Sequence, residues 1–205
     1  MRILLGCLAA CSVCFAVTPD EALAKLKAGN AKFAKGLAQN PNQSVERRLS
    51  LKTGQDPFAV VVSCSDSRVS PDLIFDQGVG DLFVIRDAGN IVGETELDSI
   101  NYAILHLKVP LVMIVGHQSC GAVEAVVKGQ TEDIPAIAKE IEPAAQRSAK
   151  MWGSRLENAI KENVRLGVEK LTDYPMYQKL IKSGKLKIVG GYYDFKSGKV
   201  IPVEL

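Results

Sequence analysis

The stretch FAVVVSCSDSRVSPD, residues 58–72, begins like a buried strand and ends in reactive side chains. Its first residues are almost all apolar and rich in valine, which predicts a strand that is buried on both faces of a sheet. Cys64, Asp66 and Arg68 follow directly, so a thiol, a carboxylate and a guanidinium leave the end of one strand. Ligand sites in open parallel sheets form beyond the carboxyl ends of the strands, so this strand end is a candidate site.

The rest of the chain alternates strands and helices. Valine- and isoleucine-rich runs at 82–86 and 111–115 predict further buried strands, and apolar residues at helical spacing over 94–108 predict a helix between them. The sequence therefore predicts an α/β fold with a mostly parallel central β-sheet flanked by helices. Other expected elements are an amphipathic N-terminal helix with a capping box at 18–21 and apolar positions from Leu23 to Leu37, helices over 45–51, 121–128, most of 134–170 and 177–182, and a C-terminal edge hairpin of 186–193 and 200–203.

The composition is that of an ordinary folded domain. The chain has 205 residues, of which 47% are hydrophobic and 23% charged, and we expect residues 17–205 to form a single domain. The net charge is +2 and no long basic run occurs, which argues against nucleic acid as a partner and against a polybasic membrane patch. A small molecule is therefore the expected partner.

The first sixteen residues, MRILLGCLAACSVCFA, have the pattern of a secretory signal peptide. They combine Arg2 with an apolar run too short to span a bilayer and a small-residue exit at Ala16. We expect export, to the periplasm of a bacterium. The residues from Leu8 to Cys11 also resemble a lipoprotein box, so lipid attachment at Cys11, and with it membrane association, is an alternative. If the leader does not function, the expected location is the cytoplasm.

A second strand end carries matching chemistry. The strand predicted at 111–115 runs into GHQSCG, residues 116–121, which supplies His117 and Cys120. Together with Cys64 these residues offer two thiolates and one imidazole, three of the four ligands of a tetrahedral zinc site. Cys64 and Cys120 are the two of the five cysteines that lie outside the leader, so a disulfide between them is the alternative in an exported protein.

Asp66 and Arg68 can both act next to a zinc ion at these strand ends. The Asp66 carboxylate can serve as a fourth ligand, or it can accept a hydrogen bond from water on the zinc. Arg68 can bind this carboxylate through two parallel hydrogen bonds and draw it off the metal. The alternative is a surface ion pair worth under about 1 kcal/mol.

The two motifs, CSDSR at 64–68 and HQSC at 117–120, closely resemble those of the β-class carbonic anhydrases. The similarity runs from about 54 through 128 and resumes at 190–194, so it covers most of the chain after the leader.

The resemblance implies a zinc enzyme that interconverts carbon dioxide and bicarbonate. It places one Zn²⁺ per chain on Cys64, His117 and Cys120, with the catalytic Asp66–Arg68 dyad gating the fourth position and orienting a hydroxide on the metal. This agrees with the chemistry of the residues, because zinc can lower the pKa of bound water from about 16 to near 7.

The resemblance also implies the residues that handle the substrate. Gln55 matches a glutamine that donates a hydrogen bond to the substrate, and Gly121 offers its backbone N–H to bicarbonate. Phe83, Ala88 and Tyr102 fall where the family lines its apolar pocket, partly across a dimer interface. We therefore expect a homodimer or a higher homo-oligomer.

Two other functions are compatible with the same three zinc ligands. A related hydrolase of carbonyl sulfide or carbon disulfide would use the same ligands behind a narrower access route, which the sequence does not reveal. A non-catalytic zinc-binding homologue would keep the ligands but lose the dyad or Gln55, and all of these residues are present.

Overall fold

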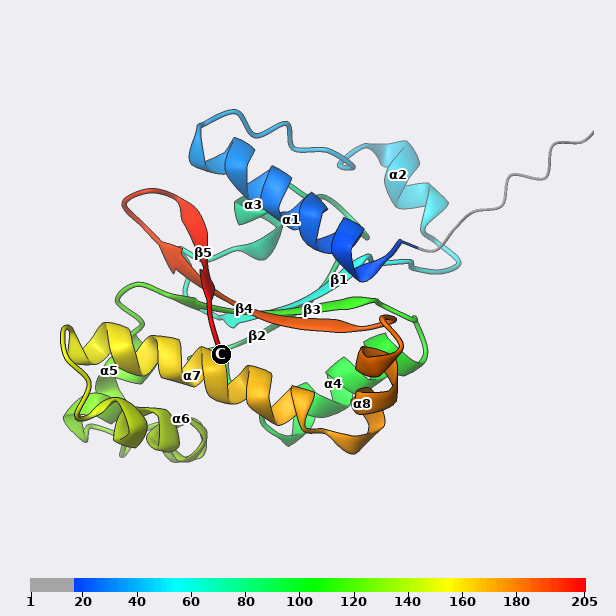
Figure 1. Ribbon diagram of the computed structural model, residues 1–205. Helices are drawn as coiled ribbons and strands as arrows, with labels where there is room; N and C mark the ends of the chain where they lie inside the picture. The colour runs from blue at the N-terminus through cyan, green and yellow to red at the C-terminus, as the bar shows by residue number, and fades with distance from the viewer. Residues whose placement is uncertain (1–16) are drawn as a thin grey trace, which may run out of the picture.

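The computed structural model describes residues 17–205 (Figure 1). The predicted signal peptide, residues 1–16, and the lipoprotein box that ends at Cys11 lie outside the described residues. Within the described range, none of the helices combines the length and the apolar character that a membrane crossing requires.

A five-stranded sheet in the order β2-β1-β3-β4-β5 forms the centre of the molecule. The first four strands are parallel to their neighbours, and β5 pairs antiparallel with β4 as the predicted edge hairpin. This confirms the predicted α/β class and its mostly parallel sheet. The strands are β1 (Ala59–Cys64), β2 (Leu82–Asp87), β3 (Leu111–His117), β4 (Lys187–Asp194) and β5 (Lys199–Val203).

Helices cover both faces of the sheet, as Figure 1 shows. Three helices lie on one face: α1 (Pro19–Ala34), α2 (Val45–Ser50) and the short α3 (Pro71–Ile74), which the sequence pattern did not indicate. Five helices lie on the other: α4 (Glu94–Leu105), α5 (Gly121–Lys128), α6 (Pro135–Ser148), α7 (Arg155–Thr172) and α8 (Pro175–Lys182). The sheet residues therefore divide between two hydrophobic clusters, one under each layer of helices.

The N-terminal helix begins as the sequence predicts. Thr18 and Glu21 form the reciprocal capping box of α1, with Pro19 at its first position. Leu26 is buried against the sheet, but Leu37 lies beyond the end of the helix and is 64% exposed. The apolar positions therefore predicted the helix correctly and its last turn wrongly.

Strand β2 differs from its expectation in burial. Its apolar run predicts a strand covered on both faces, but β2 is one of the two edge strands, and its residues are only partly buried or, for Arg86, exposed. Phe83 of β2 and the 48% exposed Tyr102 of α4 form an aromatic pair there, with ring centroids 6.2 Å apart. An edge strand with apolar side chains is a surface that another chain can cover.

Helix α7 packs closely on the sheet because the strands below it present glycines. A Cβ atom on Gly116 of β3 would lie 2.7 Å from a methyl carbon of Val164, and one on Gly190 of β4 would lie 2.6 Å from the other methyl carbon. Both distances are far inside van der Waals contact, so any side chain at these positions would push α7 away from the sheet.

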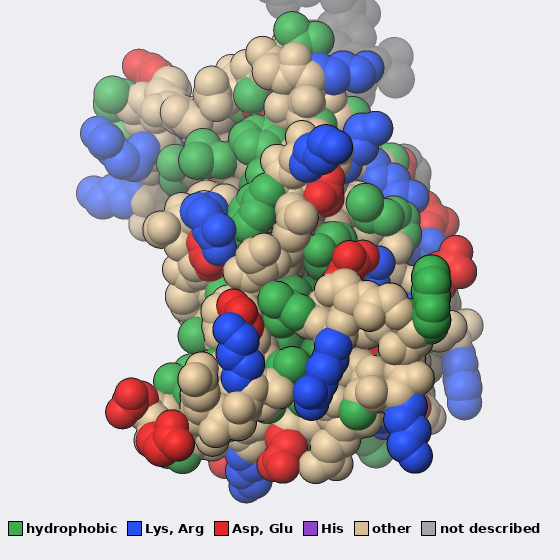
Figure 2. All heavy atoms as spheres, turned by 90° about the vertical axis from the view of Figure 1, so that its left-hand side faces the viewer, with side chains coloured by type: hydrophobic (Ala, Val, Ile, Leu, Met, Phe, Trp, Pro, Cys, Tyr) green, Lys and Arg blue, Asp and Glu red, His purple; other side chains and the backbone are tan. Residues whose placement is uncertain are grey.

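The carboxyl ends of the parallel strands all lie on the left of Figure 1, and Figure 2 looks onto that side. Basic and acidic side chains are interspersed over this face, and no histidine is visible on it. His117, at the end of β3, is indeed fully buried.

Candidate metal centre

Two adjacent strands and one helix bring the three predicted metal ligands together. Cys64 is the last residue of β1 and His117 is the last residue of β3, which pairs directly with β1. Cys120 follows three residues later as the N-cap of α5. The turn between them includes Ser119 in the left-handed region, with φ of +54°. Parallel strands that end side by side therefore place all three side chains at one point.

The geometry of the cluster fits a metal ion. The ligand atoms of Cys64, His117 and Cys120 all lie within 4.8 Å of one another, and the three residues are at most 4% exposed. The Nδ1 atom of His117 lies 2.9 Å from the carbonyl oxygen of Gln118, whereas its buried Nε2 has no hydrogen-bond partner within the described residues. A histidine held through one ring nitrogen, with the other directed at two thiols, is the arrangement of a metal ligand.

The two thiols are free cysteines, not a disulfide. Hydrogen bonding to Cys120, and then to His117 and the N–H groups of Gly89 and Asp66, lowers the pKa of the Cys64 thiol to about 4, although burial opposes this. The pKa of the Cys120 thiol is raised, first by its hydrogen bond with Cys64 and then by burial. Two thiolates this close are therefore stable only beside a cation, which a divalent metal supplies.

Asp66 and Arg68 form the predicted dyad at the border of the cluster. The Nε atom of Arg68 donates to Oδ1 of Asp66 at 2.9 Å, and Nη2 donates to Oδ2 at 2.6 Å. These bonds hold the pKa of the Asp66 carboxyl well below its usual range, against a smaller opposing effect of burial. Oδ2 also lies 3.9 Å from Nε2 of His117. The carboxylate is thus ionised, held by Arg68 and directed at the metal centre.

Two further residues support the dyad, and sequence reasoning assigned them no role. The guanidinium of Arg86 donates to the carbonyl oxygens of Cys64 at 3.1 Å and of Asp66 at 2.7 Å, so it fixes the turn between them. The ring of Phe195 lies 4.5 Å below the Arg68 guanidinium and 5.7 Å from the His117 ring. The only sequence signal for Phe195 is its position two residues after the strand predicted at 186–193.

The predicted substrate residues fall into two groups. Ala88 and Gly121 lie at the cluster: Ala88 precedes Gly89, whose N–H donates to the Cys64 sulfur, and Gly121 begins α5 directly after Cys120. A Cβ on Gly121 would contact nothing within 4 Å, so there is open space beside its backbone.

Gln55, Phe83 and Tyr102 lie elsewhere in the chain. Gln55 is exposed and lies before the start of β1, whereas Cys64 is at the other end of this strand, which is about 17 Å long. Phe83 pairs with Val60 near the amino end of the sheet, and Tyr102 is beside it. A single chain therefore does not bring these three residues to the metal centre, and their predicted roles require a second copy.

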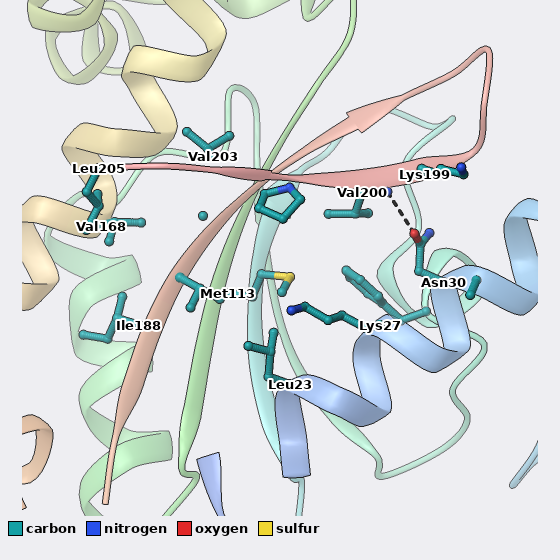
Figure 3. Close-up of a pocket in the computed structure, with 15 residues that line it drawn as sticks. Leu23, Lys27, Asn30, Met113, Val168, Ile188, Lys199, Val200, Val203 and Leu205 are labelled. Atoms are coloured by element: carbon teal, nitrogen blue, oxygen red, sulfur yellow. Dashed lines mark hydrogen bonds between the residues drawn. The ribbon is translucent and has the colours of Figure 1, made fainter. Parts of the chain in front are cut away.

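A separate cavity of about 400 Å³ lies between α1, β4 and β5, shown in Figure 3. The Lys27 side chain extends into it beside Met113, and at one end Asn30 accepts a hydrogen bond from the backbone of Val200 at 2.9 Å. Leu23, Ile188 and several other apolar residues complete the lining. None of the predicted site residues lines this cavity, so it is distinct from the metal centre.

The fold and the cluster define an α/β protein with a buried Cys–His–Cys metal centre at the carboxyl end of its parallel sheet. A family model described as "Carbonic anhydrase" matches residues 59–200. A carbonic anhydrase of Mycolicibacterium smegmatis is 38% identical over 189 residues, which cover 89% of this chain and 92% of the relative. Carbonic anhydrase 2 of Mycobacterium tuberculosis is 36% identical over 190 residues with the same coverage. The chain belongs to the β-class carbonic anhydrase family.

Solved structures agree with this assignment. The β-carbonic anhydrase CcaA has a TM-score of 0.70 and 29% identity, with 88% of this chain and 86% of that chain covered. A second match is to tetrameric β-carbonic anhydrases of the ascomycete Sordaria macrospora, with a TM-score of 0.69, 25% identity and coverage of 91% and 98%. The buried cluster of Cys64, His117 and Cys120 is the zinc site typical of this family.

Proposed function

We propose that this chain catalyses the reversible hydration of carbon dioxide to bicarbonate and a proton. Family membership supports the reaction, and the observation that carries it to this chain is the Asp66–Arg68 dyad at the border of the buried ligand cluster. A protein that used zinc only for stability would need the three ligands but not an ionised, oriented carboxylate beside them.

The residues around the metal have distinct tasks. Zinc, when bound, supplies a water molecule that is acidic enough to act as a nucleophile at neutral pH. The Asp66 carboxyl has a low pKa and is ionised, so it would accept a hydrogen bond from that water and orient it. Arg68 occupies both oxygens of Asp66 and so keeps the carboxylate from competing for the metal. The N–H of Gly121, at the first turn of α5, is placed to bind the anionic product.

The direct test is stopped-flow carbon dioxide hydration by metal-analysed protein. Asp66→Ala is expected to retain one zinc per chain and to lose roughly 100-fold or more in kcat at neutral pH, because the nucleophile is no longer oriented. Asp98→Ala, the same substitution at an exposed aspartate of α4, serves as the control and is expected to be fully active.

Three results would count against the proposal. Full activity of Asp66→Ala would remove Asp66 from the mechanism. A wild-type protein without zinc would overturn the function altogether. Faster turnover of carbonyl sulfide than of carbon dioxide would assign the same site to the related hydrolase reaction.

We propose further that the working enzyme is a homodimer, or a larger assembly of dimers. Gln55, Phe83 and Tyr102 are distant from the zinc ligands of their own chain, and the partly exposed apolar edge at β2 supports pairing with a second copy. The tetrameric β-carbonic anhydrases of Sordaria macrospora are consistent with a multiple of dimers. Sedimentation velocity of the purified protein measures the state directly, and a stable, active monomer would contradict it.

The leader supports a proposal about location. The pattern of residues 1–16 is that of a signal peptide, so we expect export, with lipid attachment at Cys11 as the alternative. Mass spectrometry of the mature protein separates the outcomes: a start near residue 17 supports export, a diacylated Cys11 supports the lipoprotein, and an intact Met1 in the cytoplasm contradicts both.

A further inference from the structure

The sulfur of Cys64 accepts two backbone hydrogen bonds. The N–H of Asp66 lies 3.4 Å from it and the N–H of Gly89 lies 3.3 Å from it. The first comes from the same turn as Cys64, whereas the second comes from the loop after β2. Hydrogen bonds to a metal-binding sulfur stabilise its negative charge and fix its orientation toward the metal. The position of Gly89 therefore bears on the zinc centre.

The backbone conformation at Gly89 requires support from its surroundings. Gly89 has φ of +88° and Asn90 has φ of +48°, both in the left-handed region. A Cβ on Gly89 would lie 2.6 Å from Cδ1 of Ile141, so α6 packs directly against the turn. The Asp87 carboxylate accepts the N–H of Ile91 at 2.8 Å and closes the turn from the strand side. These contacts restrain the turn, but none of them binds Gly89 itself through a polar group.

Asn163 of α7 supplies that polar contact. Its Nδ2 atom donates to the carbonyl oxygen of Gly89 at 2.7 Å, and the residue is only 5% exposed. The two residues are 74 positions apart in the chain, so this bond exists only because α7 packs closely on the sheet. Its neighbour Val164 makes that close approach at Gly116 and Gly190. A buried hydrogen bond from a side-chain amide is costly to lose, because water does not readily reach the carbonyl oxygen to replace the donor.

We propose that Asn163 is a positioning residue for the zinc centre, which holds Gly89 so that its N–H reaches the Cys64 sulfur. It does not touch zinc or substrate and acts through the backbone of Gly89. Loss of its amide donor lets the turn relax, weakens the N–H···S bond and leaves the Cys64 sulfur less firmly positioned for the metal. The inference rests on the zinc site of the proposed function but does not depend on which substrate that site hydrates.

The first test compares substitutions at two positions of the same helix, α7. Asn163→Leu is nearly isosteric and removes the donor, and Asn163→Ser replaces the amide with a shorter side chain whose hydroxyl does not extend as far toward Gly89. Val168→Ala is the control, because Val168 is also fully buried in α7 but packs near Gly190, away from the turn. All three are expected to lower stability, since each disturbs the packing of α7.

The readouts separate positioning from stability. Both Asn163 variants are expected to bind zinc about tenfold more weakly in chelator competition and to shift the thiolate-to-metal charge-transfer band of the cobalt-substituted protein. Val168→Ala should leave both values at those of the wild type. If the Asn163 variants behave like Val168→Ala, the positioning role is wrong while carbon dioxide hydration stands. If the wild type binds neither metal, the proposed function fails first.

A measurement on the wild-type protein keeps the proposal testable even if no Asn163 variant folds. In protein loaded with ¹¹³Cd, a hydrogen bond from an amide to a metal-bound sulfur transmits a scalar coupling between the amide proton and cadmium. We expect this coupling at the amides of Gly89 and Asp66. Absence of the Gly89 coupling, with the Asp66 coupling present, would overturn the proposal.

Discussion

Arg68 controls the protonation of Asp66, and this control has a measurable consequence. The pKa of Asp66 is low mainly because Arg68 donates hydrogen bonds to it, while burial acts in the opposite direction. In Arg68→Met the side-chain hydrogen bonds are lost, while the backbone N–H of residue 68 still donates to Asp66, so the pKa of Asp66 rises toward its ordinary value. The carboxyl then becomes protonated at a higher pH. As the pH is lowered, kcat/KM of the variant is expected to fall earlier than that of the wild type.

The measurement is a pair of pH–rate profiles for carbon dioxide hydration, each checked for zinc content. Arg68→Lys is the matched variant, because it keeps the charge but cannot bind both carboxylate oxygens through a planar fork. We expect the pH at which kcat/KM of Arg68→Lys falls on the acid side to lie between the values for the wild type and Arg68→Met. If kcat/KM falls at the same acid pH in all three proteins, Arg68 does not control the ionisation of Asp66.

For single residues, the sequence predicted the metal ligands well but did not predict the residues that hold the Asp66–Arg68 dyad in place. Cys64, His117 and Cys120 were predicted from two short motifs, and the structure brings them together. Arg86 and Phe195 were not assigned roles, because they meet Asp66 and Arg68 through pairing and loop contacts that no local pattern encodes.

Among the elements, α7 depends on glycines for its position on the sheet. Gly190→Ala places a methyl group against Val164 and is expected to lower the free energy of unfolding by about 1–3 kcal/mol. Val164→Ala in the same chain makes room for that methyl group, so the double variant should lose less than the sum of the two single variants. Urea unfolding of the four proteins measures the coupling.

The control for this cycle is Gly54→Ala, where a Cβ would contact nothing within 4 Å. Its free energy of unfolding should stay within about 0.5 kcal/mol of the wild type. Purely additive effects of Gly190→Ala and Val164→Ala would show that the close approach of α7 does not limit its packing.

The capping box of α1 gives a pH-dependent prediction. Hydrogen bonds from the backbone and side chain of Thr18 lower the pKa of Glu21 below its ordinary value of 4.5. A carboxyl with a lowered pKa in the folded state stabilises the protein above its ordinary pKa, and this stabilisation is lost as the pH falls through the lowered value. Glu21→Gln should therefore be less stable than the wild type at pH 7, and the difference should shrink below about pH 4.5.

Thermal unfolding at several pH values tests this, with Glu132→Gln, at an exposed glutamate outside the helices, as the control. A difference between wild type and Glu21→Gln that does not change with pH would contradict the assigned role. The elements themselves were largely predictable, because strands and helices followed the apolar periodicity. The pattern missed the short α3, the ends of α1 and α4, and the break at 149–154 between α6 and α7, which depend on a few residues without a repeating pattern.

At the level of the whole molecule, Gln55 lies too far from the zinc ligands of its own chain to act on them. In one chain it lies at the opposite end of β1 from Cys64, so we predict that it acts on the zinc site of a partner copy. Gln55→Ala and Asp66→Ala are each expected to lower activity and to retain zinc. In a mixed dimer of the two variants, one site carries both defects and the other carries neither.

Differently tagged chains allow the mixed dimer to be purified. If Gln55 acts across the interface, the mixed dimer should recover about half of the wild-type activity, because two-fold symmetry makes the exchange of residues reciprocal. If Gln55 acts within its own chain, the mixed dimer cannot exceed the mean of the two parent variants. That outcome would contradict the proposed pairing of the sites.

The sequence by itself determined the α/β class, the two strand ends that bear reactive groups, and the identity of the metal ligands. These features lie in consecutive residues, where periodicity and motif spacing are directly readable. Only the tertiary structure decided that β2 is a partly exposed edge, that Gln55 is remote from the ligands of its own chain, and that Asn163 of α7 bonds to Gly89. Each of these depends on which surfaces meet when the chain closes, and that is set by packing between residues far apart in the sequence.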